Sequence, residues 1–281
     1  MLSWQVGRVK ITRIVEMDLP VPLAAIRQAT PAELRKSAWL YPHFVSEDDA
    51  ILKLSIHALL VEAPGLKLVV DTCIGNDRPR EITGGLPLAT PFLQHLGEAG
   101  WSRDSVDCVV CTHLHTDHVG WNTMLEDGKW VPTFPKARYL IGRQEYEFWR
   151  TYDDEEQQAM LSDSVKPVFD AGLVELVELD HVISPELRLI PSIGHTPGHV
   201  SVSIESDGAR AVITGDMIHH PCQMAHPGWS FSDDDREAAV RTRARLFAEW
   251  SDRPVLVLGT HFPAPTAGHI VRDGAAFRFA V

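Results

Sequence analysis

The chain has 281 residues and a formal net charge of −12, from 38 acidic and 26 basic residues, with 44% hydrophobic and 23% charged residues. These proportions are ordinary for a globular protein long enough to bury a large core. The acidic balance argues against nucleic acid or an anionic membrane as a partner. We expect one domain over residues 1–281 and a small-molecule partner; a homodimer is left open.

Targeting signals are not evident in the sequence. The N-terminus runs directly into a strand-like segment without a signal peptide, and no apolar run approaches the length of a membrane helix. The four cysteines do not provide the two C-x-x-C pairs of a zinc or redox site, and we interpret them as reduced thiols. The expected location is cytoplasmic.

The first fifty residues are expected to form a strand over 4–17 and then an irregular segment over 19–50. Prolines interrupt this segment, which also carries Trp39, Tyr41 and Phe44. Such a segment is either a packed connection or a lid over a site, and packing is favoured. Within it, Thr30 followed by Pro31 predicts the cap and first turn of a short helix.

A strand pair follows over 51–62 and 66–71, joined by a Pro-Gly turn. Its second strand ends in Asp71, a candidate to orient a ligating histidine from behind. Thr90-Pro91 is expected to cap a helix that ends before Gly100. Residues 137–142 predict another strand, and residues 143–171 predict one or two helices interrupted near Pro167.

The most informative stretch is residues 111–120. A short apolar strand over 106–111 leads into three histidines and one aspartate within six residues, namely His113, His115, Asp117 and His118. Alternate side chains of an extended segment share a face, so the first three can project to one side. One metal ion does not easily take four ligands from six consecutive residues, whereas two adjacent ions can. Imidazole and carboxylate at this density suit Zn, Fe or Mn.

The second half repeats the pattern of a strand that ends in a metal-type ligand. Strands are expected over 187–193, 200–205, 209–214 and 255–258, and a long helix over 233–251 with Ser232 as its cap. His195, Asp216 and His261 follow three of these strands. His199 is interpreted as a turn residue or as support for the site. Four strand ends thus present ligands, which is a stronger signal than any single motif.

The run His-x-His-x-Asp-His after a buried strand resembles the signature of the metallo-β-lactamase superfamily. The resemblance covers nearly the whole chain by motif order. It implies an α/β (α+β) fold, an αββα sandwich of two mixed sheets flanked by helices, with a dinuclear metal site at the sheet edge. It also implies that His113, His115 and His195 hold one ion, that Asp117, His118 and His261 hold the other, and that Asp216 bridges both.

Several residues depart from the patterns of other branches of the superfamily, and these departures reduce the number of activities to consider. Asp216 stands where one class of antibiotic-cleaving members has cysteine, and the chain after His261 is too short for the helical domain of glyoxalase II-like enzymes. The runs around Asp216 and His261 resemble the methyl parathion hydrolase-like and lactonase branch. Lactonases of the quorum-quenching type usually have tyrosine three residues after the bridging aspartate, where this chain has His219.

The resulting expectation is a dinuclear zinc hydrolase of a lactone or ester, with phosphotriesters as a promiscuous substrate. A hydroxide between the ions would attack the carbonyl, and Asp117, Asp216 and His219 are the candidate catalytic residues. Two Zn²⁺ ions are expected, with Fe, Mn or Co as alternatives. The alternatives left open are a dedicated phosphotriester hydrolase, a mononuclear iron oxidoreductase of the persulfide dioxygenase type, and a non-catalytic member.

Overall fold

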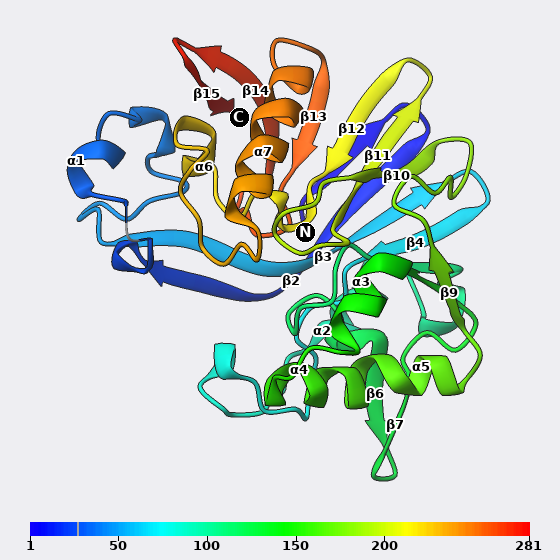
Figure 1. Ribbon diagram of the computed structural model, residues 1–281. Helices are drawn as coiled ribbons and strands as arrows, with labels where there is room; N and C mark the ends of the chain where they lie inside the picture. Colours follow the sequence, from blue (N-terminus) through cyan, green and yellow to red (C-terminus); the bar gives the residue numbers. More distant parts are fainter. Residues whose placement is uncertain (27) are drawn as a thin grey trace. The chain divides into compact units, whose positions relative to one another are not determined.

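The fold is built on two large mixed β-sheets. The structure is a computed structural model that describes residues 1–26 and 28–281. The chain divides into two units (Figure 1). The first comprises Met1–Glu16 with Ile56–Leu179, and the second comprises Met17–Ser55 with Asp180–Val281. That residues 1–281 form a single domain stays a prediction.

The first sheet has seven strands in the order β1-β2-β3-β4-β5-β8-β9. Its strands are β1 (Ser3–Val6), β2 (Val9–Pro22), β3 (Ile51–Ala63), β4 (Leu66–Val70), β5 (Cys108–Cys111), β8 (Arg138–Gly142) and β9 (Val174–Val177). From β4 to β9 neighbouring strands are parallel, whereas β1 with β2 and β3 with β4 are antiparallel. Because β5 lies between two parallel neighbours, all four of its residues are buried, and its end is a fixed platform for the loop that follows.

Turn residues set the register at the start of the chain. The predicted turn at Pro64-Gly65 joins β3 to β4, with Gly65 at a φ of +75°. The single strand expected over 4–17 is in fact the hairpin of β1 and β2. Gly7, at a φ of +56°, turns the chain there, because glycine enters this region without steric cost.

Short helices and one hairpin complete the first unit. They are η3 (Glu81–Thr83), α2 (Phe92–Glu98), η4 (Arg103–Ser105), η5 (Gly120–Asn122), the hairpin β6 (Thr123–Glu126) with β7 (Lys129–Pro132), α3 (Arg143–Trp149), α4 (Glu155–Met160), the π-helical turn η6 (Leu161–Val165) and α5 (Lys166–Asp170). The helical stretch predicted after residue 142 is therefore broken after Trp149 and at η6. Asp154 caps α4 by accepting from the Gln157 N–H. Thr90 does not cap α2, and its hydroxyl instead donates to side-chain oxygens of Glu16 and Asn76.

The second sheet lies in the second unit and has six strands, in the order β10 to β15. Its strands are β10 (Leu187–Pro191), β11 (Val200–Ser206), β12 (Ala209–Ile213), β13 (Val255–Leu258), β14 (Ala267–Asp273) and β15 (Ala276–Ala280). Only β12 and β13 pair in parallel. Three short helical turns, η1 (Leu23–Ala25), η2 (Ala38–Leu40) and η7 (Gly215–Met217), and three helices, α1 (Pro31–Leu34), α6 (Cys222–Ala225) and α7 (Arg236–Trp250), belong to the same unit.

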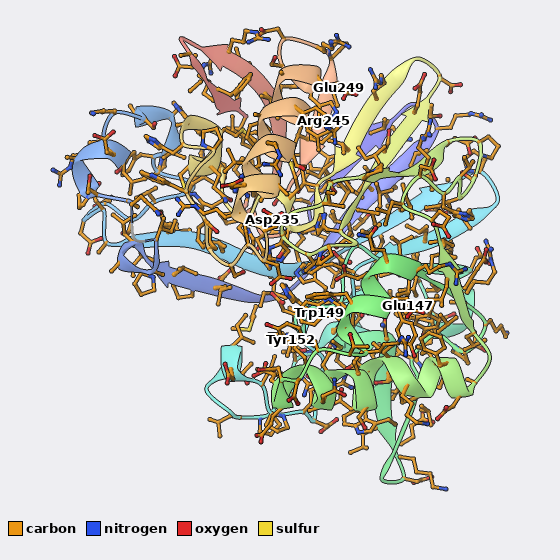
Figure 2. The ribbon with its side chains drawn as sticks, viewed as in Figure 1. Glu147, Trp149, Tyr152, Asp235, Arg245 and Glu249 are labelled. Carbon is orange, nitrogen blue, oxygen red and sulfur yellow. The ribbon has the colours of Figure 1, made fainter. Side chains whose placement is uncertain are left out.

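The long helix α7 begins three residues later than the sequence predicted. Asp235 is its cap, with its carboxylate accepting from the Ala238 N–H, and Ser232 lies outside the helix. Figure 2 labels Asp235 at this end, and Arg245 and Glu249 on an exposed face further along. The buried face contributes Leu246, Phe247 and Trp250 to the core of the unit. Residues 232–235 are thereby free to form a loop rather than a helical turn.

The irregular segment over 19–50 packs into the core of the second unit. Phe44 is fully buried and its ring makes edge contacts with Phe262 and Phe279. Trp39 and Tyr41 are partly buried against the same core. Thr30 caps α1 at Pro31 as predicted, by accepting from the Glu33 N–H. These contacts favour packing over a free lid.

Candidate metal centre

The loop after β5 gathers the four candidate ligands predicted from it. His113 and His118 are buried and their ring centroids lie 4.1 Å apart. His113 Nε2 lies 3.0 Å from His115 Nδ1, and His118 Nε2 lies 3.7 Å from a carboxylate oxygen of Asp117. Four side chains within a stretch of six residues therefore bring their nitrogen and oxygen atoms close to one another.

Asp71, at the end of β4, fixes this loop from behind. One carboxylate oxygen accepts from the Thr112 N–H at 2.8 Å. The other lies 2.9 Å from His118 Nδ1 and also accepts from the Thr112 hydroxyl. Because Asp71 accepts a hydrogen bond from the Nδ1–H of His118, the proton stays on Nδ1 and Nε2 keeps its lone pair for a cation. This is the supporting role that the sequence predicted for Asp71.

Glu145 supports the same loop, which the sequence did not reveal. Its buried carboxylate accepts from the Leu114 N–H at 3.0 Å and from the Trp149 indole N–H at 2.6 Å. Trp149, labelled at the end of α3 in Figure 2, packs edge-on to His115 at 5.2 Å. The loop is thereby attached to α3 between its first two histidines.

Glu16 is a second supporting carboxylate that the sequence did not reveal. It accepts from the backbone N–H groups of Ile74 and Gly75 and from the indole N–H of Trp121. Burial raises the pKa of Glu16, although these hydrogen bonds oppose the shift. One side chain thus joins the loop that follows β4 to the end of the ligand loop. Nothing local in the sequence marks such a long-range partner.

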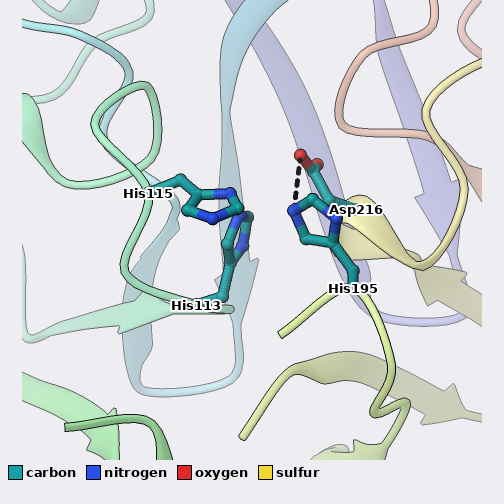
Figure 3. A group of neighbouring side chains, drawn as sticks. All are labelled: His113, His115, His195 and Asp216. Carbon is teal, nitrogen blue, oxygen red and sulfur yellow. Dashed lines mark hydrogen bonds and ion pairs between the residues drawn. The ribbon is translucent and has the colours of Figure 1, made fainter. Parts of the chain in front are cut away.

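The second unit gathers the remaining predicted residues around Asp216 in η7. One oxygen of Asp216, Oδ2, lies 3.1 Å from His261 Nε2, 3.3 Å from His219 Nε2 and 3.6 Å from His195 Nε2. Figure 3 draws His195 beside Asp216 with this ion pair dashed, and also His113 and His115. Three imidazole nitrogens thus converge on a single carboxylate oxygen.

His199 and Thr260 also contact Asp216, but at its backbone N–H and at its other carboxylate oxygen. His199 Nε2 accepts from the Asp216 N–H at 2.8 Å, and its Nδ1 lies 2.8 Å from the Ser192 hydroxyl. The Thr260 hydroxyl donates to the other oxygen of Asp216 at 3.0 Å. His199 therefore supports the site, in agreement with its interpretation from the sequence.

His219 differs from the other histidines of this group. Its ring stacks parallel to His261, with centroids 5.7 Å apart, and against Phe231 at 5.2 Å. Burial lowers the pKa of His219, and Asp216 opposes this shift. Within residues 1–26 and 28–281, Nδ1 of His219 is buried without a hydrogen-bond partner.

The orientation of the imidazole rings fits a cation. His118 Nδ1 faces Asp71, His113 Nδ1 faces the Thr112 hydroxyl at 3.1 Å, and His261 Nδ1 faces the backbone oxygen of Ser55 at 3.2 Å. An acceptor on this side favours the proton on Nδ1, so that Nε2 carries the lone pair of the neutral ring. A nitrogen oriented in this way is the usual state of a histidine that binds a metal.

The mixed sheets and the clustered histidines and aspartates define an α/β protein with a candidate metal site. The model of the metallo-beta-lactamase superfamily matches residues 52–261. The chain belongs to this superfamily, and it is an enzyme, a metal-dependent hydrolase.

Curated relatives are N-acyl homoserine lactonases of Bacillus. The protein of that name from Bacillus cereus is 24% identical over 222 residues, which cover 74% of this chain and 82% of the relative. The N-acyl homoserine lactonase AiiA of Bacillus thuringiensis subsp. kurstaki is 25% identical over 165 residues, which cover 58% of this chain and 59% of the relative.

Solved structures share the fold over almost the whole chain. The hydrolase AbOPH of the beta-lactamase superfamily has a TM-score of 0.80 at 24% identity, covering 99% of this chain and 96% of its own. AidC, a dizinc quorum-quenching lactonase, has a TM-score of 0.81 at 20% identity with the same coverage. In the part of the chain that the structure describes, no helix is both long and apolar enough to cross a membrane.

Proposed function

We propose that this protein is a dinuclear zinc hydrolase that opens a lactone or cleaves an ester. The observation that carries the proposal is the convergence of His195, His219 and His261 on one oxygen of Asp216. A carboxylate oxygen with imidazole nitrogens around it is a donor set suited to zinc and similar ions.

The donor set divides into two candidate groups. They are His113, His115, His195 and Asp216 (Figure 3), and Asp117, His118 and His261. In the proposed site each group holds one divalent ion, with Asp216 shared between the two. When bound, such a pair supplies a hydroxide at neutral pH and polarises the oxygen of the bond to be cleaved.

The protein's own residues prepare this chemistry. The Thr260 hydroxyl donates to the Asp216 carboxylate, and the Asp216 backbone N–H donates to His199. These two hydrogen bonds hold the carboxylate in one orientation before anything binds. Asp117 is the more exposed of the two aspartates, with 14% of its side chain accessible, and we assign to it the acceptance of a proton from an incoming water. Preorganised groups of this kind need no rearrangement during the reaction.

The lactonase names of a relative that is 24% identical and of a solved structure with a TM-score of 0.81 support a lactone as the substrate class. Lactones and esters share a carbonyl that is attacked and an alkoxide that leaves, so the residue near the leaving oxygen decides which is turned over fastest. Here we assign that place to His219, which stands where the quorum-quenching lactonases usually have tyrosine.

Metal analysis with a substrate panel tests the proposal. We expect about two zinc ions per chain and hydrolysis of lactones or esters faster than of phosphotriesters. One tightly held iron with oxygen consumption on a persulfide would replace the hydrolase by the oxidoreductase, and phosphotriesters as the best substrates would move the main activity to them.

An Asp216→Ala variant tests the shared ligand directly. It should lose at least one ion and lower kcat at least about a hundredfold, while its circular dichroism spectrum is unchanged. An Asp216→Ala protein that keeps both ions and normal turnover would contradict the shared-ligand assignment.

A further inference from the structure

A buried ion pair lies directly behind His195 in the second unit. Arg243, from α7, donates to one carboxylate oxygen of Asp233 at 2.8 Å and to the other at 3.4 Å. Both side chains are completely buried. Oδ1, the Asp233 oxygen that makes the longer contact with Arg243, lies 3.7 Å from His195 Nδ1. Nε2 of the same ring faces Asp216, so the ring lies between two carboxylates.

The guanidinium of Arg243 also reaches the chain on either side of the pair. It donates to the backbone oxygen of Met217 at 3.2 Å, one residue after Asp216, and to that of Pro227 at 2.9 Å. One buried side chain therefore contacts both the partner of His195 and the turn that presents Asp216. A planar guanidinium holds several acceptors in fixed directions, which the point charge of lysine does not.

Backbone hydrogen bonds from the residues after Asp233 hold the loop that contains His195. The N–H of Asp234 donates to the His195 oxygen at 3.0 Å, and the N–H of Asp235 donates to the Gly194 oxygen at 2.9 Å. A Cβ on Gly194 would lie 2.2 Å from the Ala239 nitrogen in α7, so the loop is pressed against the helix. The start of α7 thus fixes the position of the loop, and Asp233 faces the ring.

We propose that Asp233, held by Arg243, is a positioning residue that orients His195 for metal binding. The inference rests on the proposed function, since it needs His195 to be a ligand. Asp233 places a negative charge 3.7 Å from His195 Nδ1, which favours the proton on Nδ1 and the lone pair on Nε2. Asp71 acts on His118 in the same direction at the shorter distance of 2.9 Å in the first unit. The carboxylate also increases the basicity of the ring, which strengthens the bond to a cation.

A purely structural role for the pair makes a different prediction. A buried ion pair contributes little net stability, whereas removing one partner leaves an uncompensated buried charge. Loss of folding stability alone therefore does not identify a positioning role. The affinity of the folded protein for a metal does, because a structural pair leaves that affinity unchanged wherever the protein remains folded.

The test is Zn²⁺ binding to the metal-free full chain by competition with a chromogenic chelator. In Asp233→Asn we expect one of two ions to bind about 10- to 100-fold more weakly, and the other to bind as in the wild type. The visible spectrum of the Co²⁺ form should change for that one ion. Arg243→Lys keeps a charge beside Asp233, so it should fold and show a smaller loss in the same direction.

Asp234→Asn is the matched control, because it removes a neighbouring carboxylate that takes no part in the pair with Arg243. It should bind both ions as the wild type does. In a His195→Ala background, Asp233→Asn should cause no further loss of Zn²⁺ affinity, since the two residues act through one ligand.

Two results would overturn the inference. Equal Zn²⁺ affinity in Asp233→Asn, Asp234→Asn and wild type, with only a lower melting temperature for the first, would make the pair structural. An additional loss in the His195→Ala background would show that Asp233 acts elsewhere. Wild-type protein that takes up no Zn²⁺ would instead overturn the proposed function, and this outcome is seen before any variant is compared.

Discussion

At the scale of single residues, His219 is the exception among the histidines around Asp216. His261 Nδ1 faces the backbone oxygen of Ser55 at 3.2 Å. The carboxylate of Asp233 lies on the Nδ1 side of His195, with Oδ1 at the ion-pair distance of 3.7 Å. His219 also turns Nε2 toward Asp216, at 3.3 Å, but its buried Nδ1 meets no partner among the described residues. A ring without an acceptor behind it carries its proton on Nε2, where it is a donor rather than a ligand.

We therefore predict that His219 serves the leaving group. Replacing His219 by alanine should lower kcat for esters with poor leaving groups by about a hundredfold or more, and much less for activated esters, because a positioned donor matters most when the leaving oxygen is basic. The measurement is a series of aryl and alkyl esters of graded leaving-group pKa, with the zinc content of each protein determined in parallel.

His220→Ala provides the comparison for His219→Ala. His220 points into the core, where its Nε2–H donates to the Phe44 oxygen at 2.8 Å, so its loss should lower stability without any dependence on the leaving group. If His219→Ala loses zinc, or slows every ester alike, then His219 only supports Asp216.

The sequence predicted the candidate ligands but only some of the residues that support them. His113, His115, Asp117 and His118 lie within six residues, and their spacing alone indicated a metal. Asp71 was predicted because it ends a strand. Glu16, Glu145 and Asp233 act over long separations on backbone N–H groups or ring nitrogens, and no local pattern marks them. Asp233 was also missed because the sequence predicted a helix that starts at residue 233, whereas the helix begins at Arg236.

At the scale of elements, the segment over 19–50 is attached to the turn after η7 through His220. Its Nε2–H donates to the Phe44 oxygen, and its Nδ1 accepts from the Cys222 N–H at 3.1 Å. Only the neutral ring satisfies both contacts, because a second proton on Nδ1 would face the N–H of Cys222. Proline content and aromatic residues could not show whether this segment packs, since packing depends on the distant partners Phe262 and Phe279.

This arrangement predicts a pH-dependent loss of stability. Burial lowers the pKa of His220 from 6.5 to about 4. The neutral ring is favoured in the folded state, so its contribution is complete above pH 6.5 and declines as the pH falls from 6.5 toward 4. At pH 5 the loss is about 2 kcal/mol.

Urea unfolding at pH 7 and pH 5 measures this contribution. His220→Gln should be less stable than wild type at pH 7, and the difference should shrink by about 2 kcal/mol at pH 5. The other histidines are common to both proteins and cancel in the comparison. A difference that stays constant with pH would show that His220 titrates alike in the folded and unfolded states.

At the scale of the whole molecule, bound cations act on the folded state alone. The proposed ligands follow β5, β10, β12 and β13, and an unfolded chain does not bring them together. A ligand that binds only the folded state stabilises it by an amount that grows with its concentration, about 4 kcal/mol at a thousandfold excess over Kd. The net charge of −12 adds to the benefit of binding cations.

We therefore predict that removal of metal lowers the melting temperature and that zinc restores it. Protein treated with a chelator and freed of it should melt several degrees lower than the zinc-loaded protein, and the melting temperature should rise steadily with added Zn²⁺. Ca²⁺ and Mg²⁺ at the same concentrations should have little effect, because these ions select oxygen ligands over imidazole. A smaller response to Zn²⁺ in Asp216→Ala would assign the stabilisation to the proposed site, whereas an equal response in that variant would mean that zinc binds elsewhere on the chain.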